Sequence, residues 1–157
     1  MNINIRKANL DDLLVIQELN HSLFKYEIEN NFDNYIEDWS LGDMSKDYFE
    51  CMIQEEFVIL AEINGDVVGY LAGSLNKDNT YSYYEGLTAE LNNMFIVKEY
   101  RKYGIGSKLV SSFLSWCNEQ EAKRVIVTAS IGNTNTINFY KKNGFEEINI
   151  TLKKEIK

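Results

Sequence analysis

Two kinds of apolar pattern alternate along this chain, and the alternation constrains its fold more than any other feature. Short runs typical of strands occur at residues 3–7, 57–63, 67–75, 87–97, 125–129 and 145–153. Segments with helical spacing of apolar residues occur at 9–24, 104–118 and 134–143, and one or two short helices are expected at 32–39 and 45–54. The order β-α-α-β-β-β-α-β-α-β predicts an α/β (α+β) fold, in which helices flank a central sheet.

The sequence predicts a single domain over residues 1–157. It contains no proline, internal repeat or low-complexity tract that would mark a linker. Asn64-Gly65-Asp66, between two strand-type runs, predicts a hairpin. Asn9, followed by two aspartates, predicts a helix start, and residues 76–86 predict a polar, tyrosine-rich loop.

The composition is that of an ordinary globular protein. Hydrophobic residues make up 45% and charged residues 25% of the chain. Two cysteines, Cys51 and Cys117, are too few for a disulfide framework. The longest strongly apolar run, residues 57–61, is far too short to span a membrane. We therefore expect a cytoplasmic protein with free thiols and no membrane partner.

Charge is divided unevenly along the chain. The net charge of −8 argues against a nucleic-acid partner. Residues 1–90 hold 18 acidic residues and 5 Lys or Arg, whereas residues 91–157 hold 6 acidic residues and 11 Lys or Arg. This asymmetry indicates two surfaces, one for a cationic and one for an anionic ligand, although acidic helices that only keep the protein soluble are an alternative.

A glycine-containing turn joins the strand ending near Val97 to the following helix. It reads Arg101-Lys102-Tyr103-Gly104-Ile105-Gly106-Ser107-Lys108. Glycines let backbone N–H groups approach a ligand, and a helix N-terminus with basic neighbours attracts anions. The turn therefore predicts a phosphate or pyrophosphate cradle. The dinucleotide fingerprint does not fit, because it needs a glycine where Leu109 stands.

A second segment, residues 133–145, opens with Asn133 after a strand and closes with Gly144-Phe145 after a helix that contains Phe139-Tyr140. Together the two segments resemble the GNAT superfamily of acyl-CoA-dependent N-acetyltransferases. That family's signature is Arg/Gln-x-x-Gly-x-Gly/Ala after the fourth strand, then an Asn-led helix with Phe-Tyr and a closing Gly-Phe. The resemblance is close over residues 87–145 and loose over the rest. It implies a mixed, mostly antiparallel sheet whose fourth and fifth strands splay apart.

The resemblance also implies a function, in which acetyl-CoA is the co-substrate and an acetyl group passes to a primary amine by direct attack in a ternary complex. Backbone N–H groups of the turn would hold the pyrophosphate, and the fourth strand would pair with the pantetheine arm. Tyr140 would protonate the departing thiolate, unless it is only a packed aromatic, and Asn133 would contact the pantetheine, unless it is only a helix cap. The implied coenzyme A site comprises Met94, Phe95, Ile96, Arg101, Lys102, Tyr103, Gly104, Ile105, Gly106, Ser107, Asn133, Asn135 and Tyr140.

The attacking amine must lose a proton, and the tetrahedral oxyanion needs a donor, for which we expect an N–H near Met94. Asn92 and Asn93 stand where several relatives carry acids, and neither can act as a base. Glu90, two residues before Asn92 and on the same strand face unless a bulge intervenes, is the expected catalytic base, acting through water. Glu85 and proton loss to solvent without a dedicated base are the alternatives.

The acceptor is expected to be a cationic amine. Residues 27–56 contain ten acids and a single lysine, interleaved with aromatic residues that suit ion pairing and cation–π contact. A polyamine, an aminoglycoside-like molecule or a protein amine would qualify. No cysteine and histidine spacing indicates a metal, and a homodimer is compatible with the resemblance. The alternative function is a catalytically silent acyl-CoA-binding module that regulates or senses.

Overall fold

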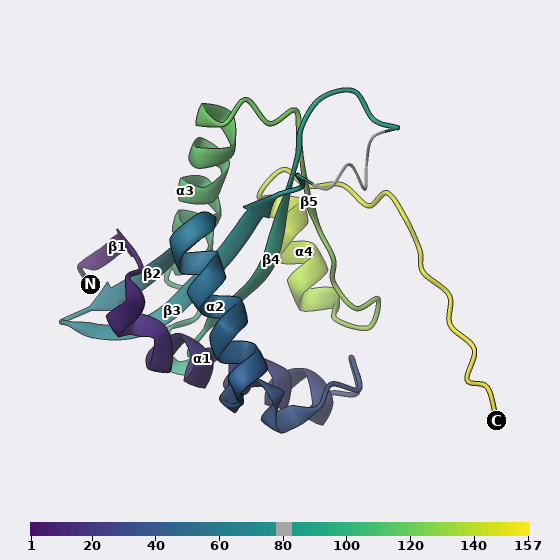
Figure 1. Cartoon of the computed structure of the whole chain (residues 1–157), viewed down its shortest axis with the longest axis horizontal. Coiled ribbons are helices and arrows are strands. Elements are labelled where there is room, and N and C mark those ends of the chain that lie inside the picture. The colour runs from purple at the N-terminus through teal and green to yellow at the C-terminus, as the bar shows by residue number, and fades with distance from the viewer. Residues whose placement is uncertain (78–82) are drawn as a thin grey trace.

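The structure is a computed structural model that describes residues 1–77 and 83–157. The strands of these residues form one five-stranded sheet in the order β1-β2-β3-β4-β5 (Figure 1). Neighbours from β1 to β4 pair antiparallel, and β5 pairs parallel to β4, which confirms the mixed, mostly antiparallel sheet. The strands are β1 (Ile3–Lys7), β2 (Phe57–Ile63), β3 (Asp66–Leu75), β4 (Thr88–Ile96) and β5 (Arg124–Val127).

Helices cover both faces of this sheet (Figure 1). They are α1 (Leu13–Glu29), α2 (Asp43–Glu55), α3 (Ile105–Glu119) and α4 (Thr134–Lys142), with short 3₁₀ segments η1 (Leu10–Asp12), η2 (Glu37–Leu41) and η3 (Lys98–Tyr100). None of the helices in the described ranges has the length and apolar character needed to cross a membrane.

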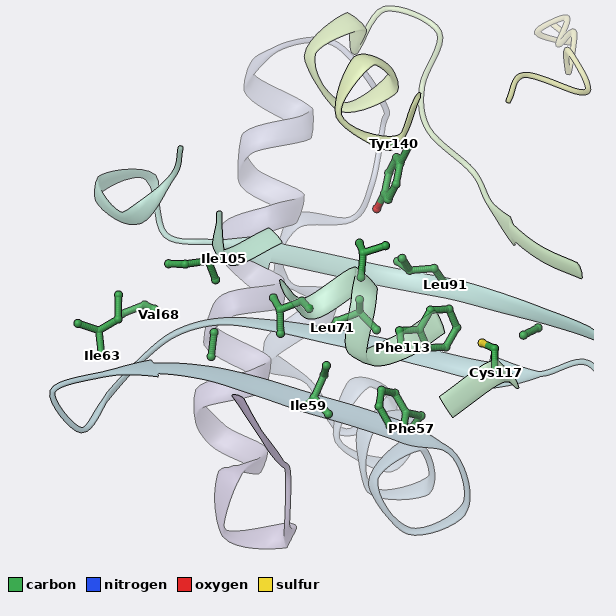
Figure 2. Packing of buried hydrophobic residues seen from close by; sticks show 14 residues of the cluster. Phe57, Ile59, Ile63, Val68, Leu71, Leu91, Ile105, Phe113, Cys117 and Tyr140 are labelled. Carbon is green, nitrogen blue, oxygen red and sulfur yellow. The ribbon is translucent and has the colours of Figure 1, made fainter. Parts of the chain in front are cut away.

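Two hydrophobic cores arise from the alternation of side chains along the strands. In β2, Phe57 and Ile59 pack into the core shared with α3 and α4, which Figure 2 shows. The intervening Val58 and Leu60 pack into the core shared with α1 and α2. Because β2 is buried on both faces, it reads as a continuous apolar run in the sequence.

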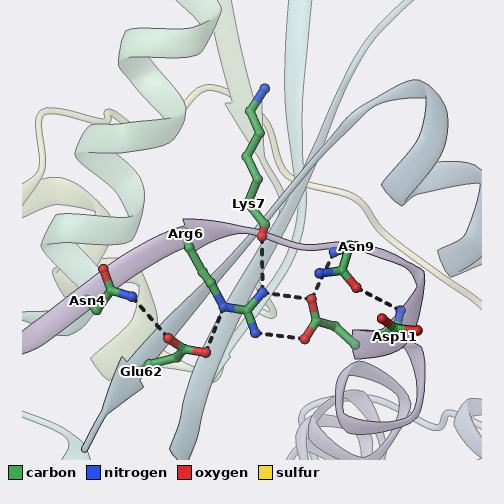
Figure 3. Close-up of polar contacts among 7 residues, drawn as sticks. Asn4, Arg6, Lys7, Asn9, Asp11 and Glu62 are labelled. Carbon is green, nitrogen blue, oxygen red and sulfur yellow. Dashed lines mark hydrogen bonds and ion pairs between the residues drawn. The ribbon is translucent and has the colours of Figure 1, made fainter. Parts of the chain in front are cut away.

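An ion-pair network joins β1, β2 and the start of α1 (Figure 3). The Arg6 guanidinium donates two hydrogen bonds of 2.8 Å to the Asp12 carboxylate and one of 2.7 Å to Glu62. Asp12 also accepts a hydrogen bond from the backbone N–H of Asn9, and Asn9 caps the helix start as its sequence position predicts. The guanidinium holds the pKa of the Asp12 carboxyl below its ordinary value.

The structure corrects two of the sequence predictions and describes a third only in part. The helix expected at 32–39 is instead the short η2, which begins at Glu37. The loop predicted at 76–86 lies partly outside the described residues. The strand predicted at 145–153 is not formed: Ile148, Ile150 and Leu152 are 60%, 73% and 88% exposed. A strand needs a hydrogen-bonded neighbour, and this segment lies beside none in the single chain.

Candidate active site

The turn before α3 presents a row of unpaired backbone N–H groups. The first hydrogen bond of α3 runs from the Lys108 N–H to the Gly104 carbonyl (3.1 Å). Within the part of the chain that the structure describes, the N–H groups of residues 102–107 donate to no protein acceptor. Lys102 and Gly104 both have left-handed backbone, with φ of 69° and 81°. Six free donors at a helix N-terminus form a ready anion site.

The two glycines of the turn have different roles. Gly104 occupies the left-handed region that glycine tolerates best, and a Cβ there would meet nothing within 4 Å. Gly106 is buried, and a Cβ there would lie 3.0 Å from the Phe139 ring and 3.2 Å from Ile96. Gly106 therefore allows α3 to approach α4 and β4 closely. Ile105 is a core residue, whereas the Tyr103 and Ser107 side chains are exposed.

The Arg101 side chain packs against the body of the protein instead of extending freely from the turn. Its Nε donates a hydrogen bond to the Ile96 carbonyl (2.9 Å), and its guanidinium lies 5.1 Å from the ring centre of Tyr26 and 5.2 Å from that of Phe95. The side chain thus fastens the turn to β4 and α1. Lys102 and Lys108 are exposed and form no ion pair with any described residue, so their charges remain available to an anion.

The fourth and fifth strands splay apart, as predicted. β5 pairs with residues 88–91 of β4, and residues 92–96 continue without a partner on that side among the described strands. Met94 and Ile96 direct their side chains into the core with α3, and Phe95 directs its ring into the core with α1 and α2. The backbone edge of this stretch is therefore open to an extended ligand that adds as a strand.

Tyr140 is 7% exposed and stands on α4. Its ring packs edge-to-face against Phe139 and Phe145, at centroid distances of 5.2 and 5.4 Å. Figure 2 shows the side chain pointing from α4 toward the sheet with the hydroxyl foremost. The hydroxyl forms no hydrogen bond with a described residue. Burial, and to a smaller extent the charge of Glu27, raise the pKa of this phenol above its ordinary value.

Asn133 caps α4, because its Oδ1 accepts a hydrogen bond of 3.2 Å from the Thr136 N–H. The side chain is almost fully buried, and its Nδ2 donates to no described residue. The helix-cap alternative is thus observed, and it leaves the amide donors unused. Asn135, in the first turn of α4, is exposed.

A β-bulge in β4 decides which side chains share a face with Glu90. Ala72 of β3 lies opposite Asn93 and Gly73 lies opposite Leu91, so Asn92 is the extra residue. Asn93, and not Asn92, therefore faces the same side as Glu90. Asn92 instead accepts a hydrogen bond from Ser74 Oγ (2.8 Å).

Glu90 and Asn93 share this face with Tyr48 of α2. The Asn93 Nδ2 lies within hydrogen-bond distance of the Tyr48 hydroxyl (3.3 Å). Glu90 is half-buried, and burial raises the pKa of its carboxyl. Burial also raises the pKa of Tyr48, and the charge of Glu90 adds to that shift. A half-buried carboxyl with a raised pKa, such as that of Glu90 beside Tyr48 and Asn93, is suited to act as a general base.

Comparison with known proteins agrees with this geometry. The model of the acetyltransferase (GNAT) family matches residues 20–145. The chain belongs to this family. Its relatives include an uncharacterized N-acetyltransferase of Methanocaldococcus jannaschii, 26% identical over 92% of this chain and 59% of the relative. The N-alpha-acetyltransferase of Sulfurisphaera tokodaii is 26% identical over 93% of this chain and 81% of the relative.

Some sequence relatives are longer than this chain, whereas proteins of similar structure match it over almost its whole length. The chain spans about three fifths of the length of the Methanocaldococcus relative and of an Archaeoglobus fulgidus N-acetyltransferase. A mutant of the BH1408 protein from Bacillus halodurans superposes with a TM-score of 0.85 at 15% identity, covering 98% of this chain and 99% of that one. The aminoglycoside N-acetyltransferase AAC(6')-Iy, solved with CoA, gives 0.77 at 17% identity, covering 99% and 95%. These likenesses confirm the GNAT fold.

Residues 27–56, called here the acidic segment, contribute two rings that stack on Phe24 of α1, and these three rings are called here the aromatic wall. The Phe24 ring stacks on Tyr35 at 4.3 Å and on Trp39 at 5.7 Å. These rings line an open cavity of about 380 Å³ together with Asn34 and Ile36. Most of the segment's acids are exposed, as a solubilising face would be.

Glu27 differs from most acids of this segment because it is partly buried. No sequence motif marks it. Burial raises the pKa of its carboxyl, the nearby charge of Asp33 adds to the shift, and a hydrogen bond from Tyr35 opposes it. Tyr48 is a second side chain of this segment that no sequence motif marks. No local pattern indicates its contact with Asn93, because the two residues are 45 positions apart. No group of residues in the described ranges is arranged to hold a metal ion.

Proposed function

We propose that this GNAT chain is an N-acetyltransferase that moves an acetyl group from acetyl-CoA to a primary amine of a cationic acceptor. The observation that carries the proposal is the row of six free N–H groups over residues 102–107, in a chain whose β4 backbone is open and whose Tyr140 hydroxyl is unclaimed. Coenzyme A has a pyrophosphate, an extended pantetheine arm and a thiol, and these three features match the three parts of the site. The crystal complexes of AAC(6')-Iy with CoA support the proposal by their common fold.

Each part of the coenzyme is held by a different element. The N–H groups of residues 102–107 donate hydrogen bonds to the pyrophosphate oxygens, and Lys102 and Lys108 add full positive charges. The main chain of Met94, Phe95 and Ile96 pairs with the pantetheine arm as a neighbouring strand would. Asn133 donates its free Nδ2 hydrogens to the arm, and Asn135 lies at the same helix start. This arrangement aims the thioester between β4 and Tyr140.

The chemistry is acyl transfer by direct attack. Glu90 takes a proton from the acceptor ammonium through water, and the neutral nitrogen attacks the thioester carbonyl carbon. A backbone N–H near Met94 donates to the tetrahedral oxyanion. Collapse breaks the carbon–sulfur bond, and the electron pair leaves on the thiolate, which takes the Tyr140 proton. The nitrogen loses its remaining extra proton to water, and Tyr140 regains a proton from water. Burial keeps that phenol protonated at neutral pH, so the proton is present when the thiolate leaves.

The acceptor is proposed to be a cationic small molecule, such as a polyamine or an aminoglycoside, or else an exposed protein amine. Ten acids between residues 27 and 56, together with the aromatic wall, favour a cation through charge and cation–π attraction. Several proteins of similar fold are aminoglycoside acetyltransferases. Because added salt screens this attraction, the KM for a cationic acceptor should rise with ionic strength.

We further propose that residues 1–157 act as one domain in the cytoplasm, where the free Cys51 and Cys117 thiols stay reduced. A catalytically silent acyl-CoA-binding module is the competing function. Thiol release from acetyl-CoA across a panel of polyamines, aminoglycosides and peptide amines separates the two. An enzyme releases thiol only when an amine is present and yields the acetylated amine by mass spectrometry. Binding of acetyl-CoA without amine-dependent release would establish the silent module.

A further inference from the structure

The aromatic wall continues as a row of rings from α1 to the face of β4 that carries Glu90. The ring centre of Trp39, which belongs to the wall, lies 6.1 Å from that of Tyr48 on α2. The Tyr48 hydroxyl is in turn 3.3 Å from Asn93 Nδ2, on the face that Asn93 shares with Glu90. Neighbouring side chains thus connect the cavity of about 380 Å³ at the wall to the proposed base.

Two acidic groups converge on the aromatic wall. Glu27 follows Phe24 by one turn of α1 and is partly buried. Its carboxyl and that of Asp33 both interact with the Tyr35 hydroxyl. No described Lys or Arg forms an ion pair with either acid. Burial, and then the charge of Asp33, raise the pKa of Glu27, and a carboxylate held this way is stabilised by a cation that binds beside it.

The other end of this row of rings carries an unpaired hydrogen-bond acceptor. Asn93 Oδ1 is buried and accepts no hydrogen bond within the described part of the chain, whereas Nδ2 contacts Tyr48. Buried acceptors are nearly always paired in folded proteins, so such an atom indicates a donor that arrives with a ligand. A protonated amine supplies three N–H donors. The face shared with Glu90 is also where the proposed base needs an amine.

We propose that the acceptor is a linear diamine or polyamine that binds at both ends of this row of rings, a proposal that rests on the N-acetyltransferase function. The reacting amine donates a hydrogen bond to Asn93 Oδ1 beside Glu90. A second ammonium group lies against the aromatic wall and the Glu27 carboxylate, where ion pairing and cation–π attraction act together. The methylenes between the two amines pack on the rings of Trp39 and Tyr48.

The lining of the cavity favours a linear polyamine over an aminoglycoside. An aminoglycoside carries many hydroxyl groups, and each one loses free energy when it is buried without a hydrogen-bond partner. Methylene groups have no such requirement and gain from contact with apolar surface. Besides Asn34, the described lining residues are aromatic or aliphatic: Phe24, Tyr35, Ile36 and Trp39.

A series of α,ω-diamines with four to ten carbons tests this, with spermidine as the polyamine. Each diamine is compared with the monoamine in which a methyl group replaces the second ammonium. At the best length we expect the KM of the diamine to be at least about tenfold lower than that of its monoamine, because only the diamine pairs with Glu27. Equal KM values at every length, or a higher kcat/KM for aminoglycosides or peptide amines than for any linear amine, would overturn the proposal.

Variants separate the two ends of the acceptor. Glu27→Gln should raise the KM of the diamine about tenfold or more and leave the KM of the monoamine and of acetyl-CoA unchanged. Glu18→Gln removes the same charge from an exposed position of α1 and should change none of them. Asn93→Leu should raise the KM of diamine and monoamine alike, without lowering the unfolding temperature, because it removes an unpaired buried oxygen. Equal effects of Glu27→Gln on the two amines would overturn the proposal.

Calorimetry distinguishes failure of this proposal from failure of the enzymatic function. If no amine is acetylated, the N-acetyltransferase function fails. Binding of the diamine in the presence of CoA, which has no acetyl group to transfer, is then still measurable. Binding that is weakened by Glu27→Gln but not by Glu18→Gln supports the diamine site. Absence of binding, or equal affinity of the two variants, overturns it.

Discussion

Tyr140 combines a buried ring with an unclaimed hydroxyl, and this combination defines what it can do. The ring is held by Phe139 and Phe145, so the hydroxyl has a fixed position relative to the sheet. Its raised pKa prevents it from acting as a base at neutral pH and leaves it an acid. A single atom, the phenolic oxygen, therefore separates the catalytic interpretation of Tyr140 from the purely structural one.

Tyr140→Phe removes that oxygen and keeps the packing. We expect kcat to fall by about 10²-fold, the low end of general acid catalysis, because a thiolate is a tolerable leaving group. Acetyl-CoA affinity measured by calorimetry and the thermal unfolding temperature should stay close to wild type. A kcat loss below about threefold, with chemistry shown to be rate-limiting, would make Tyr140 a packing residue only.

The proposed role of Glu90 as the base predicts a pH dependence of definite sign. The base works when deprotonated, so kcat/KM should fall as pH falls through the Glu90 pKa. Because burial raises that pKa above its ordinary value of 4.5, the decline should begin at a higher pH than for an exposed glutamate. Glu90→Gln should abolish this acid limb and lower the rate at neutral pH. Glu85→Gln is the control, and loss of the limb in that variant instead would assign the base to Glu85.

At the scale of elements, the sequence predicts well wherever a pattern is local. Period-two and period-3.6 patterns place most strands and helices within a few residues, and the Gly104 turn is recognisable because glycine tolerates its positive φ. The bulge at Asn92 is not predictable in this way, since it depends on the register of β3 against β4. The segment at 145–153 has a strand pattern, but it pairs with no strand among the described residues.

Side-chain direction limited the prediction of the site more than the choice of residues did. Gly106 and Arg101 belong to the predicted turn. In the structure, however, Gly106 lies closely against the Phe139 ring, and the Arg101 guanidinium lies over the Tyr26 ring. Nothing in the local sequence reports these contacts, because both depend on how α1 and α4 pack. A charged substitution at Gly106 would therefore test packing, and a test of the anion cradle belongs at an exposed position of the turn.

Ser107→Asp provides that test. Residue 107 lies in the first turn of α3 and is exposed, so an aspartate there suits the helix dipole but repels a pyrophosphate. We expect the acetyl-CoA Kd to rise by about tenfold or more with an unchanged or slightly higher unfolding temperature. Ser111→Asp, one turn later on an exposed position of the same helix, is the matched control and should bind normally. Equal affinity in both variants would remove the pyrophosphate from this turn.

The Arg6 network should make stability depend on pH. Because the pKa of Asp12 is lower in the folded than in the unfolded chain, its contribution is complete above the unfolded value and is lost as pH falls through the folded one. Asp12→Asn should lower the free energy of unfolding by about 1.5–3 kcal/mol at neutral pH, and by less in acid. Asp11→Asn, at the exposed neighbouring aspartate, should change it little. Urea unfolding at both pH values measures this, and equal losses in the two variants would contradict it.

At the scale of the whole molecule, a basic half and an acidic half of the chain meet on one sheet. The basic turn and α4 come from the second half of the chain, and the acidic, aromatic segment comes from the first half. Both halves reach β4, since Asn93 contacts Tyr48 of α2, and Met94 and Ile96 pack in the core that includes Tyr140 of α4. In the proposed mechanism, the coenzyme and the acceptor are bound at the same time on these two sides of β4.

Initial rates of thiol release on a grid of acetyl-CoA and amine concentrations test this central claim most directly. Direct attack in a ternary complex predicts reciprocal plots that intersect, with one acetylated amine formed for each thiol released. Parallel lines are the mark of a covalent acyl-enzyme, which this site has no assigned nucleophile to form. Parallel lines, or thiol release that is independent of any amine, would contradict the account.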